Sequence, residues 1–163
     1  MKNLALSFLA VFSLNSFANN MVGINYNSFD TLDGFGLSLS GNSDSLVYDI
    51  DIVNLENDFG GSATFNFVHL GYAFGEISDG SFYVGVGTAD SNVSGGDRIS
   101  GAEVGYVLRD NGGIQYKVGV LTGDFEEVID FEVQIPTGGG NIELGVLHDD
   151  GESWATVGYS FNF

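Results

Sequence analysis

The chain has 163 residues, of which 25 are glycine, one is proline and none is cysteine. The lack of cysteine excludes disulfides, thiolate metal sites and cysteine nucleophiles, and a formal net charge of -18 argues against a surface that binds nucleic acid. Abundant glycine, 13% aromatic residues and almost no proline are typical of many short strands joined by glycine-rich turns. The length fits a single domain.

The first eighteen residues (1–18) have the pattern of a secretory signal peptide. Lys2 supplies a positive charge, residues 4–14 form an apolar stretch too short to span a bilayer as a helix, and small residues stand at a cleavage site that ends at Ala18. A buried N-terminal strand or helix is the alternative. We expect cleavage after Ala18, which leaves residues 19–163 as the mature domain of an exported protein.

Alternating apolar and polar residues then predict ten strands, separated by connections rich in glycine, aspartate or asparagine. No segment after the leader repeats apolar residues with a helical period, and no linker or second domain stands out. An eight-stranded alternative would require two of the turn signals to be absent. In chain order the predicted strands cover residues 20–29, 34–40, 46–54, 63–74, 82–89, 99–109, 114–122, 128–135, 141–148 and 154–163.

Each predicted strand has one apolar face and one face of polar residues and glycine. In a soluble β-sandwich the apolar faces pack together, whereas in a transmembrane barrel the apolar face meets lipid and the polar face lines the interior. Glycine weakens a solvated strand, but a narrow barrel interior needs small residues wherever larger ones cross it. The polar faces therefore predict these lumen-facing residues: Asp49, Asp51, His69, Glu103, Lys117, Asp130, Glu132 and Glu143.

The aromatic residues also favour the barrel. If the first strand runs outward, seven aromatic residues of the apolar face lie near one rim, as in the aromatic girdle of a membrane barrel. These residues are Tyr72, Phe74, Phe82, Tyr106, Tyr116, Phe161 and Phe163. The sequence therefore predicts an all-β, antiparallel, up-and-down transmembrane barrel with an even number of strands and both termini on the same side.

The last eight residues, Thr156 to Phe163, carry a specific pattern. A polar residue is followed by Gly158 and then by two alternating aromatic residues, Phe161 and Phe163. This pattern resembles the C-terminal assembly signal of Gram-negative outer-membrane β-barrel proteins, and the mature chain resembles the small OmpA/OmpX/opacity-type or porin-like barrels. Those barrels commonly have eight strands, whereas this sequence predicts ten.

The resemblance implies a location and a set of partners. It implies cleavage of the signal peptide, delivery by periplasmic chaperones, and insertion into the bacterial outer membrane by the barrel-assembly machinery. The assembly signal would then comprise Thr156, Gly158, Phe161 and Phe163. The resemblance further implies contact with outer-membrane lipids and lipopolysaccharide, and a monomeric state.

The predicted lumen is acidic. Closing the hairpin of strands 114–122 and 128–135 places Lys117 opposite Glu132, with Asp130 one pair further along, which predicts an ion pair across part of the interior. Carboxylates still outnumber cations, so an open lumen would favour cations, whereas side chains in so narrow a barrel could instead plug it. We therefore predict a structural or narrow porin-like barrel. A barrel for surface adhesion or envelope stability is the alternative.

Candidate catalytic groups are few. His148 is followed by Asp149 and lies near Ser153 in sequence, but a catalytic triad is defined by its geometry, and this segment is rich in turn-forming residues. The acidic run 54–58 lacks the spacing and the glycine of an EF-hand loop. We expect no enzymatic activity, no cofactor and no metal site. A lipid-modifying enzyme is the least favoured alternative.

Overall fold

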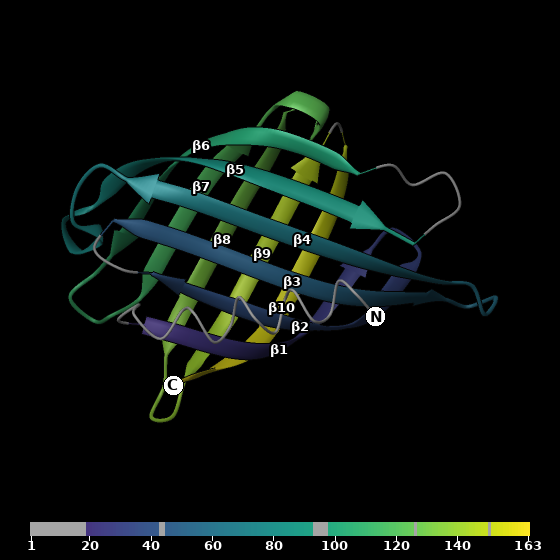
Figure 1. Ribbon diagram of the computed structural model, residues 1–163. Coiled ribbons are helices and arrows are strands. Elements are labelled where there is room, and N and C mark those ends of the chain that lie inside the picture. The colour runs from purple at the N-terminus through teal and green to yellow at the C-terminus, as the bar shows by residue number, and fades with distance from the viewer. Residues whose placement is uncertain (1–18, 43–44, 93–97, 126, 150) are drawn as a thin grey trace.

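The computed structural model describes residues 19–42, 45–92, 98–125, 127–149 and 151–163, which form a closed antiparallel barrel of ten strands (Figure 1). Each strand pairs with its neighbours in sequence, and β1 pairs with β10 to close the sheet. The predicted all-β antiparallel barrel is confirmed, and the eight-stranded alternative is wrong. The predicted signal peptide lies outside the described residues.

The strands are seven to twelve residues long, and two 3₁₀ helices lie in connections. η1 (Ile77–Asp79) lies between β4 and β5, and η2 (Gly123–Phe125) lies between β7 and β8. The strands are β1 (Asn19–Phe29), β2 (Leu32–Asn42), β3 (Leu46–Asn57), β4 (Ser62–Ala73), β5 (Ser81–Ser91), β6 (Ile99–Arg109), β7 (Gln115–Leu121), β8 (Val128–Pro136), β9 (Asn141–Asp149) and β10 (Glu152–Asn162).

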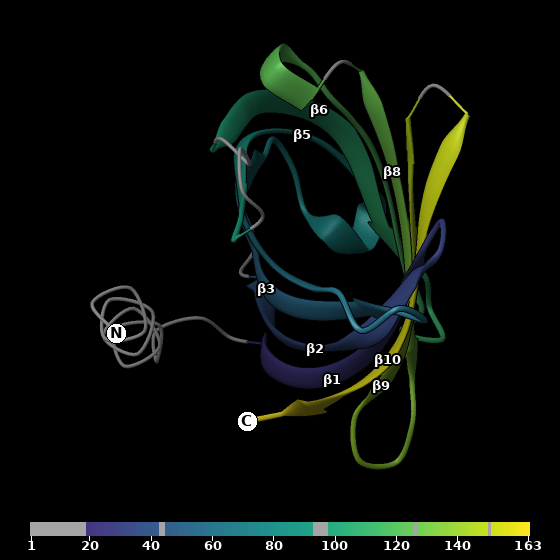
Figure 2. The same cartoon turned by 90° about the vertical axis from the view of Figure 1, so that its right-hand side faces the viewer.

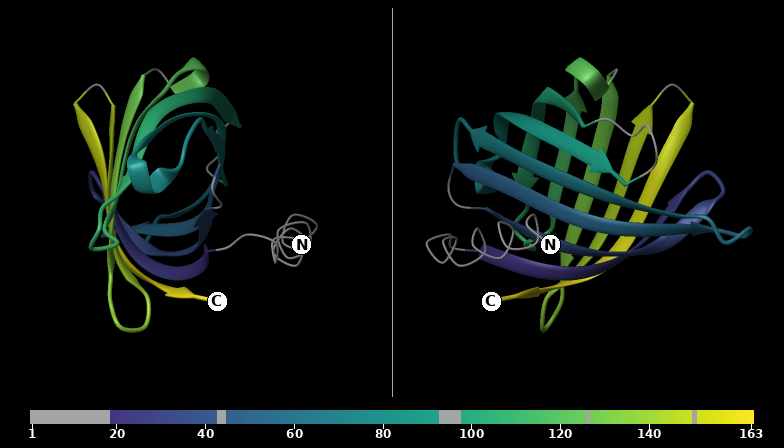
Figure 3. Two further views of the ribbon diagram at one scale, coloured as in Figure 1. Left: turned by 90° about the vertical axis from the view of Figure 1, so that its left-hand side faces the viewer. Right: turned by 45° about the vertical axis from the view of Figure 1, so that its right-hand side comes forward.

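The start of β1 and the end of β10 lie at the same end of the barrel, which we call the terminal end (Figures 1 and 3). Because neighbouring strands run antiparallel, the β2–β3, β4–β5, β6–β7 and β8–β9 connections also lie there. The other five connections lie at the opposite end, which we call the far end. Both cavities described below are placed relative to these two ends.

An apolar belt surrounds the outside of the barrel. Exposed aliphatic or aromatic side chains project outward from nine of the strands, for example Leu37 (59% exposed) on β2 and Val104 (59%) on β6. The remaining strand, β3, contributes the half-buried Ile50 and Ile52. These residues alternate with inward-facing ones, as the side-chain period of two requires. Exposed apolar surface therefore continues around the outside of the sheet, which is unusual for a protein surface in water.

Aromatic residues gather on the belt near the terminal end. Edge-to-face pairs form between Tyr72 and Phe74, whose ring centroids are 5.6 Å apart, and between Phe82 and Tyr106, at 5.2 Å. A further outward aromatic, Phe161, contacts Tyr159 at 4.9 Å on β10. The residues predicted to form an aromatic rim therefore belong to one end of the barrel.

Glycines inside the barrel make room for a large side chain. Tyr83 projects inward from β5 and is fully buried, with 0% exposure. A Cβ atom added to Gly105 on β6 would lie 2.5 Å from the Tyr83 hydroxyl, and one added to Gly119 on β7 would lie 2.6 Å from the same hydroxyl. Neither position can carry a side chain while Tyr83 crosses both strands.

Candidate functional site in the barrel interior

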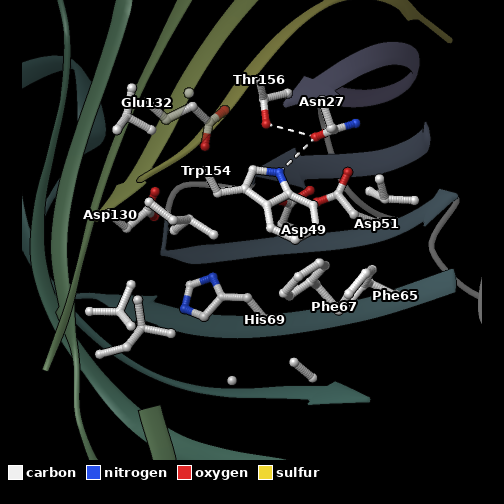
Figure 4. Close-up of a pocket in the computed structure, with 18 of the residues that line it drawn as sticks. Asn27, Asp49, Asp51, Phe65, Phe67, His69, Asp130, Glu132, Trp154 and Thr156 are labelled. Carbon is white, nitrogen blue, oxygen red and sulfur yellow. Dashed lines mark hydrogen bonds between the residues drawn. The ribbon is translucent and has the colours of Figure 1, made fainter. Parts of the chain in front are cut away.

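The main cavity occupies the middle and the far end of the barrel. It has a volume of 390 Å³ and is lined by residues from all ten strands and from η2. Apolar side chains dominate its far end (Figure 4). We call the part of its wall that carries the charged residues predicted to face the lumen the floor: Asp49, Asp51, His69, Glu103, Lys117, Asp130, Glu132 and Glu143. This cavity, apolar at one end and acidic at the other, is the candidate functional site of the chain.

The aromatic group at the far end is built around Trp154, which projects inward from β10 and is 9% exposed. Its ring packs edge-to-face against Phe65 and Phe67 of β4, with centroids 5.3 and 5.4 Å away, and lies 5.4 Å from the ring of Phe29. The rest of this apolar cluster comprises Leu32, Val53, Leu55 and Leu147. Aromatic pairs of this kind each add about 0.5–1.5 kcal/mol beyond the burial of their area.

A chain of hydrogen bonds connects Trp154 to the acidic floor. The indole N–H of Trp154 donates to Asn27 Oδ1 over 3.0 Å, and the hydroxyl of Thr156 donates to the same oxygen over 2.8 Å (Figure 4). Asn27 in turn donates to Asn25 Oδ1 over 2.8 Å, and Asn25 donates to Asp51 Oδ1 over 3.2 Å. These bonds hold the indole in one orientation toward the cavity.

Two ion pairs cross the floor of the cavity, one formed by Lys117 and the other formed by His69 when its imidazole is protonated. Lys117 Nζ lies 2.6 Å from Asp130 Oδ2 and 3.8 Å from Glu132 Oε2. His69 Nε2 lies 2.5 Å from Glu103 Oε2, and the hydroxyl of Tyr83 donates to Glu103 Oε1. Pairing of this kind is what makes charges tolerable in a buried site.

The register places Lys117 directly opposite Glu132, which is the pairing that the strand assignment predicts. The shorter contact, however, is diagonal and joins Lys117 to Asp130. A diagonal neighbour on an antiparallel pair is within reach of a long side chain. Lys117 is therefore shared between two carboxylates.

All eight residues predicted to face the lumen line the main cavity. Four of them belong to the two ion pairs described above. Glu132 lies at the longer distance from Lys117, while Asp49, Asp51 and Glu143 have no cation within ion-pair distance among the described side chains. The complete set is Asp49, Asp51, His69, Glu103, Lys117, Asp130, Glu132 and Glu143.

A second cavity of 210 Å³ lies toward the terminal end. Met21, Arg109, Gln115 and Gln134 are among its lining residues, and none of the residues lining it lines the main cavity. The guanidinium of Arg109 donates to Gln115 Oε1 over 2.9 Å. The two spaces are therefore separate parts of the interior.

An apolar plug occupies the interior at the terminal end. The connection between β4 and β5 folds inward, so that η1 lies within the outline of the barrel (Figures 2 and 3). Ile77 of η1 is 6% exposed. It belongs to a buried cluster with Val47, Ala73, Tyr83 and Val107. Packed apolar side chains therefore close much of the lumen on this side.

The alternating pattern assigns only polar residues and glycine to the lumen, so it does not predict the inward aromatic group. A signal was present, because Phe65 and Phe67 share the parity of His69 on the same strand. Trp154 likewise shares the parity of Thr156 and Gly158. Strand parity therefore identifies these aromatic residues as inward-facing when it is applied without regard to polarity.

The C-terminal motif is divided between the two faces of β10. Thr156 faces the interior, whereas Phe161 (51% exposed) and Phe163 (61%) face outward. The backbone N–H of Phe163 donates to the carbonyl of Asn20 over 3.1 Å. The strand therefore remains paired with β1 up to the last residue, while the terminal aromatic side chain is left largely uncovered.

The segment that resembles a triad in sequence is split by the strand. His148 Nδ1 lies 2.9 Å from Ser153 Oγ on the outer surface. Asp149 instead lines the cavity on the opposite face of β9, and so cannot orient the imidazole of His148. Asp150 lies outside the described residues. The His–Ser contact thus lacks the third member that a triad requires.

The described chain has neither a metal-binding cluster nor a helix that could cross a membrane. No group of three or more His, Asp or Glu residues in it is arranged to hold a metal ion. Its helices, η1 and η2, have three residues each, and none of them could span a bilayer.

Comparison with known proteins gives a similarity in structure to a solved β-barrel domain. No protein-family model matches the sequence, and no curated protein matches it. The solved N-terminal β-barrel domain of Pseudomonas aeruginosa OprF matches with 15% sequence identity and a TM-score of 0.41, covering 89% of this chain and 97% of that one. The assignment of a closed barrel rests on the strand pairing described above.

Proposed function

We propose that this chain is an integral β-barrel protein of the Gram-negative outer membrane, with a structural role and a lumen closed toward the terminal end. The observation that carries the proposal is the apolar belt. Residues such as Phe35 (68% exposed), Val86 (61%) and Ile24 (58%) lie on different strands of the belt and would all be exposed to water in a soluble protein. A lipid environment removes that cost.

The outer membrane is favoured over other membranes by two features of the sequence. The leader predicts export, and the pattern that ends in Phe161 and Phe163 resembles the assembly signal of outer-membrane barrels. We propose that β10 is the strand that the barrel-assembly machinery recognises, with periplasmic chaperones delivering the chain. The inserted barrel would be a monomer in contact with lipids and lipopolysaccharide, because the sheet closes on itself and leaves no free edge.

A structural role is favoured over a porin-like one by the interior. The cluster around Ile77 and Tyr83 lies between the terminal end and the main cavity, and the two cavities share no lining residue. Ordinary hydrated solutes need a continuous polar passage. The acidic floor favours a second candidate, a narrow cation-preferring channel, which a change in the plug would have to open.

We also propose that the chain has no catalytic role and needs no cofactor. His148 and Ser153 contact each other, but Asp149 faces the opposite side of the sheet. In the His69–Glu103 pair the carboxylate of Glu103 is already engaged, because it also accepts a hydrogen bond from Tyr83.

Fractionation of a Gram-negative host that expresses the full chain tests the proposed location. The protein should sediment with the outer membrane and resist a urea wash. An unboiled sample should migrate differently from a boiled one on an SDS gel, because a closed barrel resists unfolding by detergent. Recovery in the soluble periplasmic fraction, with the same migration before and after boiling, would contradict the proposal.

A further inference from the structure

The charges on the floor of the main cavity do not balance. Lys117 is shared by Asp130 and Glu132, and His69 is paired with Glu103. The remaining acids of the floor, Asp49, Asp51 and Glu143, have no cation within ion-pair distance among the described side chains. The acidic residues that line the cavity are Asp49, Asp51, Glu103, Asp130, Glu132, Glu143, Asp149 and Glu152. A bound cation would balance part of this negative charge.

Two buried polar atoms on the cavity wall lack hydrogen-bond partners within the described chain. Glu143 is 8% exposed, and its Oε1 has no hydrogen-bond partner within the described chain. Ser38 is 6% exposed, and its Oγ has none either. A buried carboxylate oxygen without a donor is costly, so this position favours a ligand that donates hydrogen bonds or carries positive charge.

The two side chains meet over a glycine. Gly23 on β1 lies between them, and a Cβ atom built there would lie 3.3 Å from Glu143 Oε2 and would overlap Ser38 Oγ. The absence of a side chain at Gly23 lets the hydroxyl group of Ser38 occupy this position beside the carboxylate of Glu143. Both residues also line the main cavity, so their unpartnered oxygens belong to its wall.

The wall above the floor suits the apolar part of a ligand. Trp154, Phe65 and Phe67 line the cavity, and the bonds from Trp154 through Asn27 and Asn25 to Asp51 fix the indole in place. Aromatic faces attract organic cations, and indole does so most strongly. A fixed aromatic wall over unpaired carboxylates is thus complementary to a molecule that is apolar and positively charged.

We propose that the main cavity binds an organic ammonium ion that carries an apolar group. The ammonium group lies against Asp49, Asp51 and Glu143, and the apolar group lies against Trp154 and the phenylalanines of β4. An inorganic cation would use the carboxylates but gain nothing from the aromatic wall. This binding requires neither conduction nor catalysis, so it goes beyond the proposed structural role.

Benzyltrimethylammonium is a suitable probe because it joins a quaternary ammonium group to an aromatic ring and does not dissolve membranes. The full chain, inserted in lipid nanodiscs, is titrated with the probe, and binding is followed by calorimetry and by fluorescence. Trp154 is the only tryptophan in the sequence, so a change in emission reports the site directly. Benzyl alcohol and benzenesulfonate serve as the neutral and anionic comparisons.

Removal of one carboxylate isolates the electrostatic contribution. We expect Glu143→Gln, which preserves the shape of the side chain, to weaken probe binding by about tenfold or more, since the contact between the carboxylate and the quaternary ammonium charge is lost. Asp58→Asn is the matched control, because it removes the same charge from an exposed connection and should leave the affinity unchanged. Heat-modifiable migration verifies that both variants fold.

Each possible result either supports or contradicts the proposal. Saturable binding of the cation, with a change in Trp154 emission and a weaker affinity in Glu143→Gln alone, supports the proposal. Equal binding of benzyl alcohol, equal loss in both variants, or no saturation by the cation in a correctly folded barrel would overturn it. The assay starts from inserted protein, so its failure is distinguishable from a failure of the proposed membrane location.

Discussion

At the scale of single residues, large side chains inside the barrel lie over glycines of the neighbouring strands. Tyr83 is buried completely because two neighbouring strands carry glycine where its ring and hydroxyl lie. Its hydroxyl donates to Glu103, which also contacts His69. The glycines therefore position a charged group as well as filling space, because a shift of Tyr83 would leave Glu103 without its donor.

Gly105→Ala tests this arrangement. The new methyl group would lie 2.5 Å from both the Tyr83 hydroxyl and the carbonyl oxygen of Val118, and the backbone oxygen cannot move freely. We expect a loss of about 1–3 kcal/mol in the free energy of unfolding, measured by urea titration in lipid vesicles with tryptophan emission. Gly138→Ala is the control: nothing lies within 4 Å of its Cβ position. An equal effect in both variants would contradict the proposed role of Tyr83.

Val104→Arg tests the outer face of β6, at the residue that precedes Gly105 in the sequence. Val104 is 59% exposed and points outward from β6. If the belt lies in lipid, an arginine near the middle of the bilayer should cost about 2–4 kcal/mol in the same assay. Asn111→Arg, in the exposed β6–β7 connection, should change the stability by no more than about 0.5 kcal/mol. A barrel that tolerates both changes equally would not be embedded in lipid.

At the scale of elements, the strands were predictable and their ends less so. Alternation identified all ten, yet β2 extends over Leu32–Asn42 where the pattern predicted 34–40. Its ends continue the ladder, pairing Leu32 with Asn57 and Asn42 with Val47. Turn-forming residues such as Asp33 and Gly41 lie in these ends, so local composition predicts a loop where pairing with β3 maintains a strand.

The interior was predictable only in part. Parity placed the charged residues on the inner face because each strand alternates strictly. Lys117 lies closer to Asp130 than to Glu132. This difference depends on side-chain reach, which parity does not specify. The plug formed by Ile77 depends on how the β4–β5 connection folds inward, and no periodic pattern marks that connection.

Phe163→Ala tests β10 as an assembly element. The side chain is 61% exposed, while the backbone N–H keeps its bond to Asn20, so the stability of the folded barrel should change little. If the terminal aromatic belongs to the assembly signal, the amount of folded protein in the outer membrane should fall severalfold, as measured by heat-modifiable migration of membrane fractions. Phe74→Ala removes an equally exposed aromatic (67%) from the same end and should insert normally. Similar insertion of both variants would count against the signal.

At the scale of the whole molecule, the barrel combines an apolar outside, an acidic interior and a one-sided closure. The terminal end carries the aromatic rim and the plug, whereas the far end carries the larger cavity. In an open pore a polar passage connects both ends, whereas we propose that the plug closes this lumen toward the terminal end. A change in the plug alone should therefore change the conductance of the barrel.

The wild-type protein should be silent in planar-bilayer recordings, because the cluster of Val47, Ile77 and Tyr83 interrupts the lumen. Replacing Ile77 with serine and Tyr83 with alanine in one variant should join the two cavities and produce a current carried by cations, since carboxylates outnumber Lys117 on the floor. The control is Phe82→Ala, which removes an outward side chain that is 67% exposed and adjacent in sequence to Tyr83. This variant should remain silent. A wild-type current would show that the plug does not close the lumen. Anion selectivity in the opened variant would contradict the assignment of the carboxylates to the path of the ions.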